Sequence, residues 1–194
     1  MDRNPVDARK RGRPTAAERA ERLNELLDAA IRLFAARGLS SVTIDDIAAE
    51  ARVAKRTIYT HFGDRTEIFL ASVERLRERT MNQAPSTATL SELAEHIVLA
   101  LHSDEAVGLH RLMIIEAANQ PDLARSFYQE GPEGYIRQIR VRLSAENAAL
   151  AEPLFSLLLG EAHRKRLLGL APAPNVEAAS KHAKSALATI GLHD

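Results

Sequence analysis

The chain has 194 residues, which is enough for one or two domains with a substantial core. It has no cysteine, which excludes disulfides and thiolate metal sites. No stretch approaches the roughly 20 apolar residues of a membrane span, and the polar N-terminus does not have the pattern of a secretory signal. We therefore expect a cytoplasmic protein that makes no membrane contact.

Basic and acidic residues balance overall, with 26 of each, but they are distributed unevenly. Residues 1–81 hold 16 basic against 13 acidic residues, a net charge of +3. Residues 82–194 hold 10 against 13, a net charge of −3. The asymmetry is small, and it suits a protein that meets nucleic acid at one end only.

Residues 1–14 contain a basic run with glycine and proline, Arg9 to Pro14. Its cations repel one another and its Gly and Pro oppose helix formation, so this segment is expected to be a disordered basic arm. Arg11 and Arg13 could enter an A·T-rich minor groove, where the negative potential is enhanced. The alternative is a solvated charged terminus.

The next segment has the pattern of one long helix. Thr15 and Glu18 form a predicted capping box, apolar residues follow at helical spacing through Phe34, and Gly38 ends the helix. These apolar residues are expected to form the core of a small domain that spans residues 15–81.

Residues 43–62 have the pattern of two short helices joined by a tight turn. Thr43 is a candidate N-cap, and Ile47 and Ile58 supply apolar faces on either side of the turn. The second helix is basic and polar on its outer face, as in a helix-turn-helix whose second helix enters a DNA major groove. The candidate DNA-binding residues of this segment are Thr43, Lys55, Arg56, Thr57, Tyr59, Thr60 and His61.

This pattern resembles the DNA-binding core of the TetR family of bacterial transcriptional regulators. The match runs from about Glu18 to Arg79 and includes Gly38, Thr43, Ile47-Ala48, Thr57-Ile58-Tyr59, Phe62 and Arg65. A cation in the first turn of a helix is unfavourable for the helix dipole, so Arg65 is expected to face a phosphate. The resemblance implies that the helix from Asp64 to about Arg79 links two domains. Three positions depart from the family pattern. Arg52 stands where Gly is usual, Ala54 where Ser often caps the helix, and Arg56 where a small residue is common.

Residues 82–194 have the pattern of further helices and no convincing strand, so the predicted fold class is all-α with about nine helices. A polar connector at 82–89 precedes helices that begin near Thr89, Ser103, Asp122, Glu133, Pro153 and Asn175, with the helix from Glu133 expected to reach about Ala148. Residues 105–174 resemble the C-terminal domain of the AefR-like branch of the TetR family. That resemblance implies a ligand-sensing and dimerising domain.

The sequence contains no recognisable catalytic or phosphate-binding motif, and we expect neither an enzyme nor a cofactor. The spacings of His96, His102 and His110 do not place two of them on one helical face as metal ligands, so no metal site is predicted. Glu161 and His163 are two residues apart and do not face each other on a helix.

The apolar helix at 153–169 and the alanine-rich helix at 175–191 are the candidate homodimer interface. Two-fold symmetry would set two recognition helices about 34 Å apart, which matches successive major grooves.

The preferred hypothesis is a dimeric repressor that a small, apolar effector releases from a pseudo-palindromic operator of double-stranded DNA. The alternative is an architectural DNA-binding protein without a ligand. Candidate ligand-binding residues are Leu99, His110, Met113, Ile114, Ala117, Phe127, Tyr128, Tyr135, Phe155 and Leu158. For any single apolar or aromatic residue among them, a place in the ordinary core is the favoured alternative, and His110 would supply a polar anchor.

Overall fold

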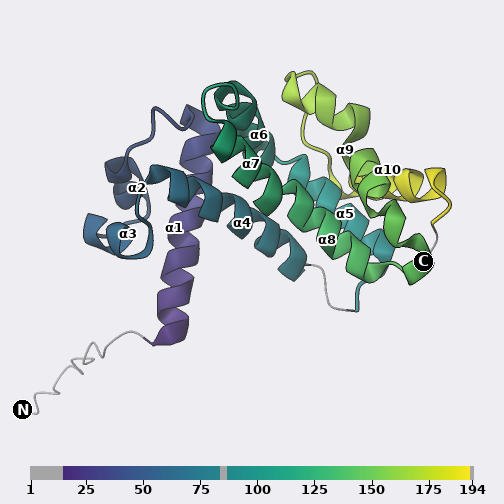
Figure 1. The fold of residues 1–194 in the computed structure, drawn as a ribbon, viewed down its shortest axis with the longest axis horizontal. Helices are drawn as coiled ribbons and strands as arrows, with labels where there is room; N and C mark the ends of the chain where they lie inside the picture. Colours follow the sequence, from purple (N-terminus) through teal and green to yellow (C-terminus); the bar gives the residue numbers. More distant parts are fainter. Residues whose placement is uncertain (1–14, 84–86, 193–194) are drawn as a thin grey trace, which may run out of the picture.

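The computed structural model describes residues 15–83 and 87–192, and within these ranges the chain is helical with no strand (Figure 1). The basic arm, with Arg11 and Arg13, lies outside the described residues. The helices are α1 (Ala16–Arg37), α2 (Ile44–Glu50), α3 (Lys55–His61), α4 (Arg65–Gln83), α5 (Leu90–Leu101), α6 (Asp104–Glu116), α7 (Pro121–Glu130), α8 (Pro132–Arg142), the 3-10 helix η1 (Ala145–Leu150), α9 (Ala151–Leu167) and α10 (Val176–Thr189).

Capping residues set where many of these helices begin. Complete capping boxes start α1 at Thr15, α2 at Thr43 and α5 at Thr89. The side chains of Ser103 and Asn175 accept hydrogen bonds from backbone N–H groups at the starts of α6 and α10. Because the first N–H groups of a helix have no partner within it, these side chains fix the boundaries locally. All five starts agree with the sequence-based expectation.

Two helical segments differ from that expectation. The helix that begins in the region of Glu133 ends at Arg142, because Leu143 and Ser144 are extended and a separate 3-10 turn follows. The helix expected at 153–169 begins at Ala151 and is interrupted at Gly160, whose φ of 54° and ψ of −156° are not helical. This combination of angles is accessible to glycine and strained for other residues.

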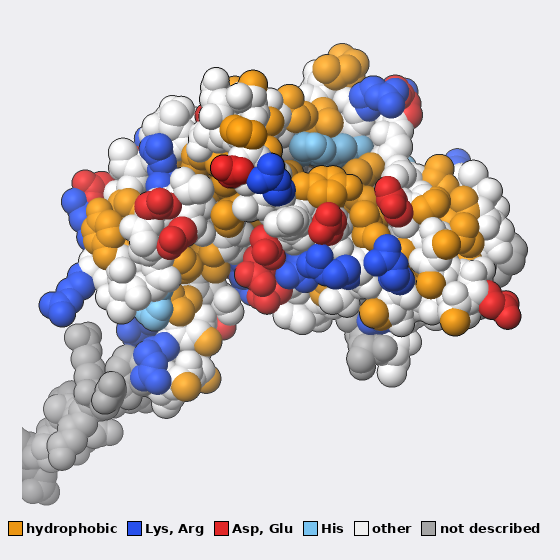
Figure 2. All heavy atoms as spheres, in the orientation of Figure 1, with side chains coloured by type: hydrophobic (Ala, Val, Ile, Leu, Met, Phe, Trp, Pro, Cys, Tyr) orange, Lys and Arg blue, Asp and Glu red, His pale blue; other side chains and the backbone are white. Residues whose placement is uncertain are grey.

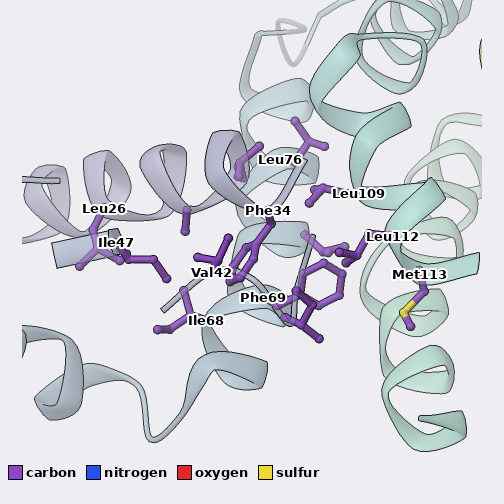
Figure 3. Close-up of a cluster of buried hydrophobic side chains, with 14 of the residues drawn as sticks. Leu26, Phe34, Val42, Ile47, Ile68, Phe69, Leu76, Leu109, Leu112 and Met113 are labelled. Carbon is purple, nitrogen blue, oxygen red and sulfur yellow. The ribbon is translucent and has the colours of Figure 1, made fainter. Parts of the chain in front are cut away.

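A first core joins the predicted DNA-binding half to the helices that follow it. Phe34 of α1 and Phe69 of α4 meet edge to face with centroids 5.6 Å apart, and Ile47 and Ile58 are fully buried beside them. Figure 3 shows that this cluster continues without interruption to Leu109, Leu112 and Met113 on α6. A change in the packing of α6 can therefore reach α1 and α4 directly.

Helices α1 and α6 approach unusually closely at Gly108. A Cβ atom added to Gly108 would lie 2.6 Å from the Cβ of Ala35, well inside van der Waals contact. The absent side chain is thus what allows the two backbones to meet at this point.

Helix α4 passes between the two halves of the molecule (Figure 1). Arg75 and Arg79 both pair with Asp28 of α1, at 3.1 and 3.3 Å, and Arg79 also pairs with Glu105 of α6. These groups are partly buried, so the pairs hold α1, α4 and α6 in register as well as contributing charge attraction.

A second core lies among α5, α8, α9 and α10. Ala179, Ala183, Ala186 and Leu187 of α10 are buried in it, as are Leu154 and Leu158 of α9. Most of the apolar residues that were expected to face a partner chain therefore pack within their own subunit. In the described ranges no helix combines the length and apolar character needed to cross a bilayer.

Candidate DNA interface and ligand cavity

The loop before α2 is held by hydrogen bonds from two directions. The Thr43 hydroxyl accepts from the Asp46 backbone N–H at 3.1 Å and donates to the Asp46 carboxylate at 2.6 Å. The Thr43 hydroxyl and backbone N–H both donate to the Asp46 carboxylate, and together with Arg37 they lower the pKa of Asp46 to about 2. A guanidinium nitrogen of Arg65 donates to the carbonyls of Ser40 and Val42, both at 3.1 Å. The start of α2 is therefore fixed relative to α1 and α4.

The turn between α2 and α3 contains the one non-glycine residue with positive φ in the described ranges, Arg52 at 55°. Arg52, which stands where Gly is usual, thus makes the bend in a conformation that favours glycine. Ala54 provides no side-chain cap for α3, as its identity predicts. The orientation of α3 thus depends on packing through Ile58, which is fully buried.

The outer face of α3 consists of exposed polar and basic side chains. Figure 2 shows Lys and Arg side chains at the end of the molecule that α2 and α3 form. Tyr59, one of the candidate DNA-binding residues, is 59% exposed. The other exposed residues of α3 are Lys55, Arg56, Thr57, Thr60 and His61.

Two of these side chains already have partners. Lys55 pairs with Asp45 of α2, and the Thr60 hydroxyl donates to the Arg56 carbonyl at 2.7 Å. The Arg56 guanidinium makes no hydrogen bond or ion pair within the part of the chain that is described. Arg56 is therefore the cation of α3 whose donors are available to a base edge or a phosphate.

Arg65 makes a contact that the sequence did not predict. One of its guanidinium nitrogens donates to the Ser40 and Val42 carbonyls, while its expected phosphate contact stays a prediction. This contact is a structural one, and the loop conformation that creates it could not be read from helical spacing.

A groove beside α3 includes basic residues that were not among the predicted DNA-binding residues. It has a volume of about 480 Å³ and lies between α1 and the α2–α3 turn. Arg22 and Arg52 line it together with Thr57 and His61. The positive side of the interface therefore extends from α3 onto α1.

A small apolar cavity lies where α4 meets the helices that follow it. Its volume is about 60 Å³, and it adjoins a groove of about 340 Å³ that opens to the surface. Val73 and Leu76 of α4 line the cavity, together with Leu101, Ala106, Leu109, His110, Phe127, Gly131, Pro132, Tyr135, Phe155, Leu159 and His163. The cavity and the groove share His110, Phe127, Pro132, Phe155 and Leu159.

Aromatic rings form much of the cavity wall. Tyr135 and Phe155 are stacked with centroids 6.1 Å apart, and Phe127 lies 6.1 Å from His110. The Tyr135 hydroxyl donates to the Thr80 hydroxyl at 3.2 Å. Burial raises the pKa of Tyr135 to about 12, so the ring remains neutral.

Four histidines form a cluster, and two of them, His110 and His163, line this cavity. His110 Nδ1 lies 3.0 Å from His163 Nε2, and the rings of His163 and His182 each lie edge-on to His102. Burial is the main cause that lowers the pKa of His163 to about 4, and it also lowers the pKa values of His102 and His110. No set of three or more metal-ligating side chains in the described segments is arranged to hold a metal ion.

Comparison with known proteins identifies the family. Residues 26–72 match the model for bacterial regulatory proteins of the tetR family. Residues 88–191, more than half of the chain, match the C-terminal domain of AefR-like transcriptional repressors. The chain belongs to the TetR family. It is a DNA-binding transcriptional regulator and not an enzyme.

Several TetR-family proteins are similar over much of the chain. The HTH-type transcriptional regulator TtgW of Pseudomonas putida is 26% identical over 133 residues, which is 66% of this chain and 98% of TtgW. The structure of the flavonoid-responsive regulator FrrA has a TM-score of 0.62 at 26% identity and covers 88% of this chain and 95% of FrrA. A TetR-family regulator from Mesorhizobium loti, with a TM-score of 0.64 at 21% identity, covers 91% of this chain and 96% of its own and shares the fold.

Most of the predicted ligand-binding residues of this TetR-family protein come together. His110, Phe127, Tyr135 and Phe155 line the cavity, and Met113, Ile114, Ala117 and Tyr128 line the adjoining groove. Leu99 and Leu158 line neither space. Leu158 is buried in the second core, and Leu99 packs against that core.

His163 is the polar residue of the cavity wall that the sequence analysis did not predict. It was considered only as a partner of Glu161, which it does not face. Glu161 instead pairs with Arg164 at the surface. The signal was the glycine three residues before it, because a break at Gly160 changes which side of α9 the following residues present.

Proposed function

We propose that this TetR-family regulator is a homodimeric repressor that a small, mainly apolar molecule releases from a pseudo-palindromic operator. The observation that carries the proposal is the position of α4. Val73 and Leu76 on α4 line the cavity, while Arg65 at its start holds the loop before α2. One rigid helix thus touches both the effector space and the support of the DNA-reading helix.

The same helix provides a route for linkage between the two sites. A ligand that enlarges the cavity pushes on Val73 and Leu76 and so shifts α4 against α1. Because Arg65 and the buried Ile68 move with α4, the orientation of α2 and α3 changes. A ligand that binds the shifted conformation better than the DNA-bound one lowers operator affinity by the same factor as DNA lowers ligand affinity.

The proposed dimer forms through the outer faces of α9 and α10. Although Leu187 and three alanines of α10 pack inward, its outer face carries small residues that permit close helix approach, Ala178, Ser185 and Ala188. A shallow groove of about 410 Å³, bordered by Leu157 and Lys181, runs along this face. Two-fold pairing here would present two α3 helices to one side of the DNA.

The effector class follows from the cavity wall and from one relative. The cavity is lined by apolar and aromatic side chains and by two neutral histidines, so it suits an apolar ligand. FrrA is named as flavonoid-responsive, and it is among the structures that this chain resembles at 26% identity. An aromatic effector is consistent with both observations.

A hydroxyl-radical footprint on a DNA fragment selected from random sequence by the purified protein tests the proposal. The repressor hypothesis predicts a bounded site with two half-sites one helical turn apart, together with a dimer in sedimentation equilibrium. Diffuse protection along the fragment would instead support an architectural DNA-binding protein. A monomer at micromolar concentration would contradict the two-fold arrangement.

A further inference from the structure

Hydrogen bonds connect the break in α9 at Gly160 with the histidine cluster. In the turn before Gly160, the carbonyl of Leu157 lies 2.9 Å from His182 Nε2, and the carbonyl of Leu158 lies 2.9 Å from His102 Nε2. Carbonyls only accept hydrogen bonds, so each of these Nε2 atoms carries the proton. The carbonyls at an interrupted helix need partners from elsewhere, and two histidines supply them.

This arrangement places His163, on the second part of α9, at the wall of the cavity. Its ring stacks on His110 with centroids 5.2 Å apart and lies edge-on to His102 at 5.2 Å. The side chain is almost completely buried, with 5% of the residue exposed. Its Nε2 is used by His110, but its buried Nδ1 has no hydrogen-bond partner in the protein.

In the neutral His110–His163 pair, either ring can carry the proton that lies between His110 Nδ1 and His163 Nε2. If His163 Nε2 donates to His110 Nδ1, then His163 Nδ1 is an unmet acceptor. If His110 donates, then His163 Nδ1 is an unmet donor. In both cases a buried polar atom is left without a partner, which is unfavourable until a bound group satisfies it, and such a group reaches the atom only when the cavity opens.

We propose that the cavity binds a neutral aromatic molecule that carries a hydroxyl group, with this hydroxyl hydrogen-bonded to His163 Nδ1. The proposal rests on the effector role proposed above and names the ligand class and its polar anchor. A hydroxyl both donates and accepts, so it satisfies either arrangement of the histidine pair. The rings of Phe127, Tyr135 and Phe155 supply the surface for the aromatic body.

The charge of the wall excludes ionic ligands from this class. None of the described residues that line the cavity is Lys, Arg, Asp or Glu. A carboxylate or an ammonium group inside the cavity would lose its hydration without an opposite charge to compensate. The adjoining groove has one charged lining residue, Glu152, which is exposed at the surface.

The size of the cavity requires it to open when the ligand enters. A volume of about 60 Å³ holds a few water molecules, whereas the adjoining groove offers about 340 Å³. Phe127 and Phe155 stand between the two spaces and line both. Their displacement would merge cavity and groove and would move the wall that Val73 of α4 shares.

Two probes of nearly equal shape test the anchor, 2-naphthol and 2-methylnaphthalene, which differ in having a hydroxyl or a methyl group. The chain has no tryptophan, so naphthalene fluorescence can be followed without interference from indole. The measured quantity is the ratio of the two dissociation constants, methylnaphthalene over naphthol. We expect His163→Leu to lower this ratio about tenfold, which corresponds to ~1.4 kcal/mol.

Two variants control for damage to the fold. His163→Gln retains a donor and an acceptor and is expected to keep the ratio within about threefold of the wild-type value. His96→Asn alters a histidine of α5 that is outside the cluster, where its ring bonds to the Glu92 carbonyl, and should leave the ratio unchanged. Continued binding of 2-methylnaphthalene by His163→Leu shows that the cavity itself is intact.

The proposal is overturned if His163→Leu and the wild-type protein give the same ratio, or if the wild-type protein binds neither probe. It is also overturned by a combination of two results. In that case His163→Leu binds neither probe, and His163→Gln lowers the ratio by about tenfold, as expected for loss of the hydrogen bond. None of these outcomes affects the operator footprint. A bounded footprint with a failed probe test removes the ligand class only, whereas diffuse protection removes the proposed repressor function itself.

Discussion

Replacing Arg65 with alanine separates a structural role from a DNA contact. The substitution removes both hydrogen bonds to the Ser40 and Val42 carbonyls. Hydrogen bonds from charged groups contribute about 1.5–3 kcal/mol when buried. Because this site is only partly buried and water can replace the donor, we expect the free energy of unfolding to fall by about 1–2 kcal/mol. That loss leaves a typical domain folded.

The salt dependence of operator binding then decides between the two roles. If Arg65 only holds the loop, Arg65→Ala weakens binding by up to about tenfold, but the slope of log K against log salt stays unchanged. If Arg65 contacts a phosphate, each subunit loses one released counterion and the slope falls by about 0.9 per subunit, or about 1.8 per dimer.

Urea unfolding measures the free energy of unfolding, and fluorescence anisotropy at several salt concentrations measures the salt slope of operator binding. Arg56→Ala is the matched control for stability. Arg56 is exposed and has no partner within the described residues, so its loss should leave the free energy of unfolding unchanged. A reduced salt slope for Arg65→Ala with unchanged stability would refute the structural role assigned to Arg65.

Four further predictions test other parts of the molecule. Arg56→Ala should reduce the ratio of specific to non-specific affinity in a competition assay, because a lost base contact relaxes discrimination by about 1–3 kcal/mol; a uniform loss across sequences would contradict this. Gly108→Ala should lower stability in urea by about 1–3 kcal/mol, because its Cβ would meet Ala35 at 2.6 Å; an unchanged midpoint would show that α1 and α6 separate easily. The pKa of His163 is lowered to about 4, so the unfolded chain binds more protons and stability should fall as the pH drops from about 6.5 through 4; His163→Gln should show a shallower decline, and an identical one would assign the acid sensitivity elsewhere. Deletion of residues 1–14 should weaken binding most where the operator has A·T-rich flanks, and equal affinity for all flanks would remove the arm from the interface.

The parts of this fold that depend on local chemistry could be predicted from the sequence. Capping boxes at Thr15, Thr43 and Thr89 mark helix starts because their hydrogen bonds close within four residues. The exposed basic face of α3 follows from the helical spacing around Ile58. The all-α class follows from the same periodicities.

The parts that depend on contacts between distant residues could not be predicted in this way. The bonds of Arg65 to a loop more than 20 residues away leave no trace in the local pattern. The burial of the α10 alanines in the second core cannot be read from composition. The histidine cluster joins the C-cap residue of α5 to residues of α6, α9 and α10, so no local spacing reveals it.

Dimethyl sulfate protection of the selected operator tests most directly whether α3 reads the major groove. The reagent methylates guanine N7, which lies in that groove and is the acceptor that arginine commonly meets. We expect protected guanines in two major-groove segments one helical turn apart, with the protection lost in Arg56→Ala. Guanines that remain reactive in a DNA complex formed by the wild-type protein would contradict major-groove reading by α3.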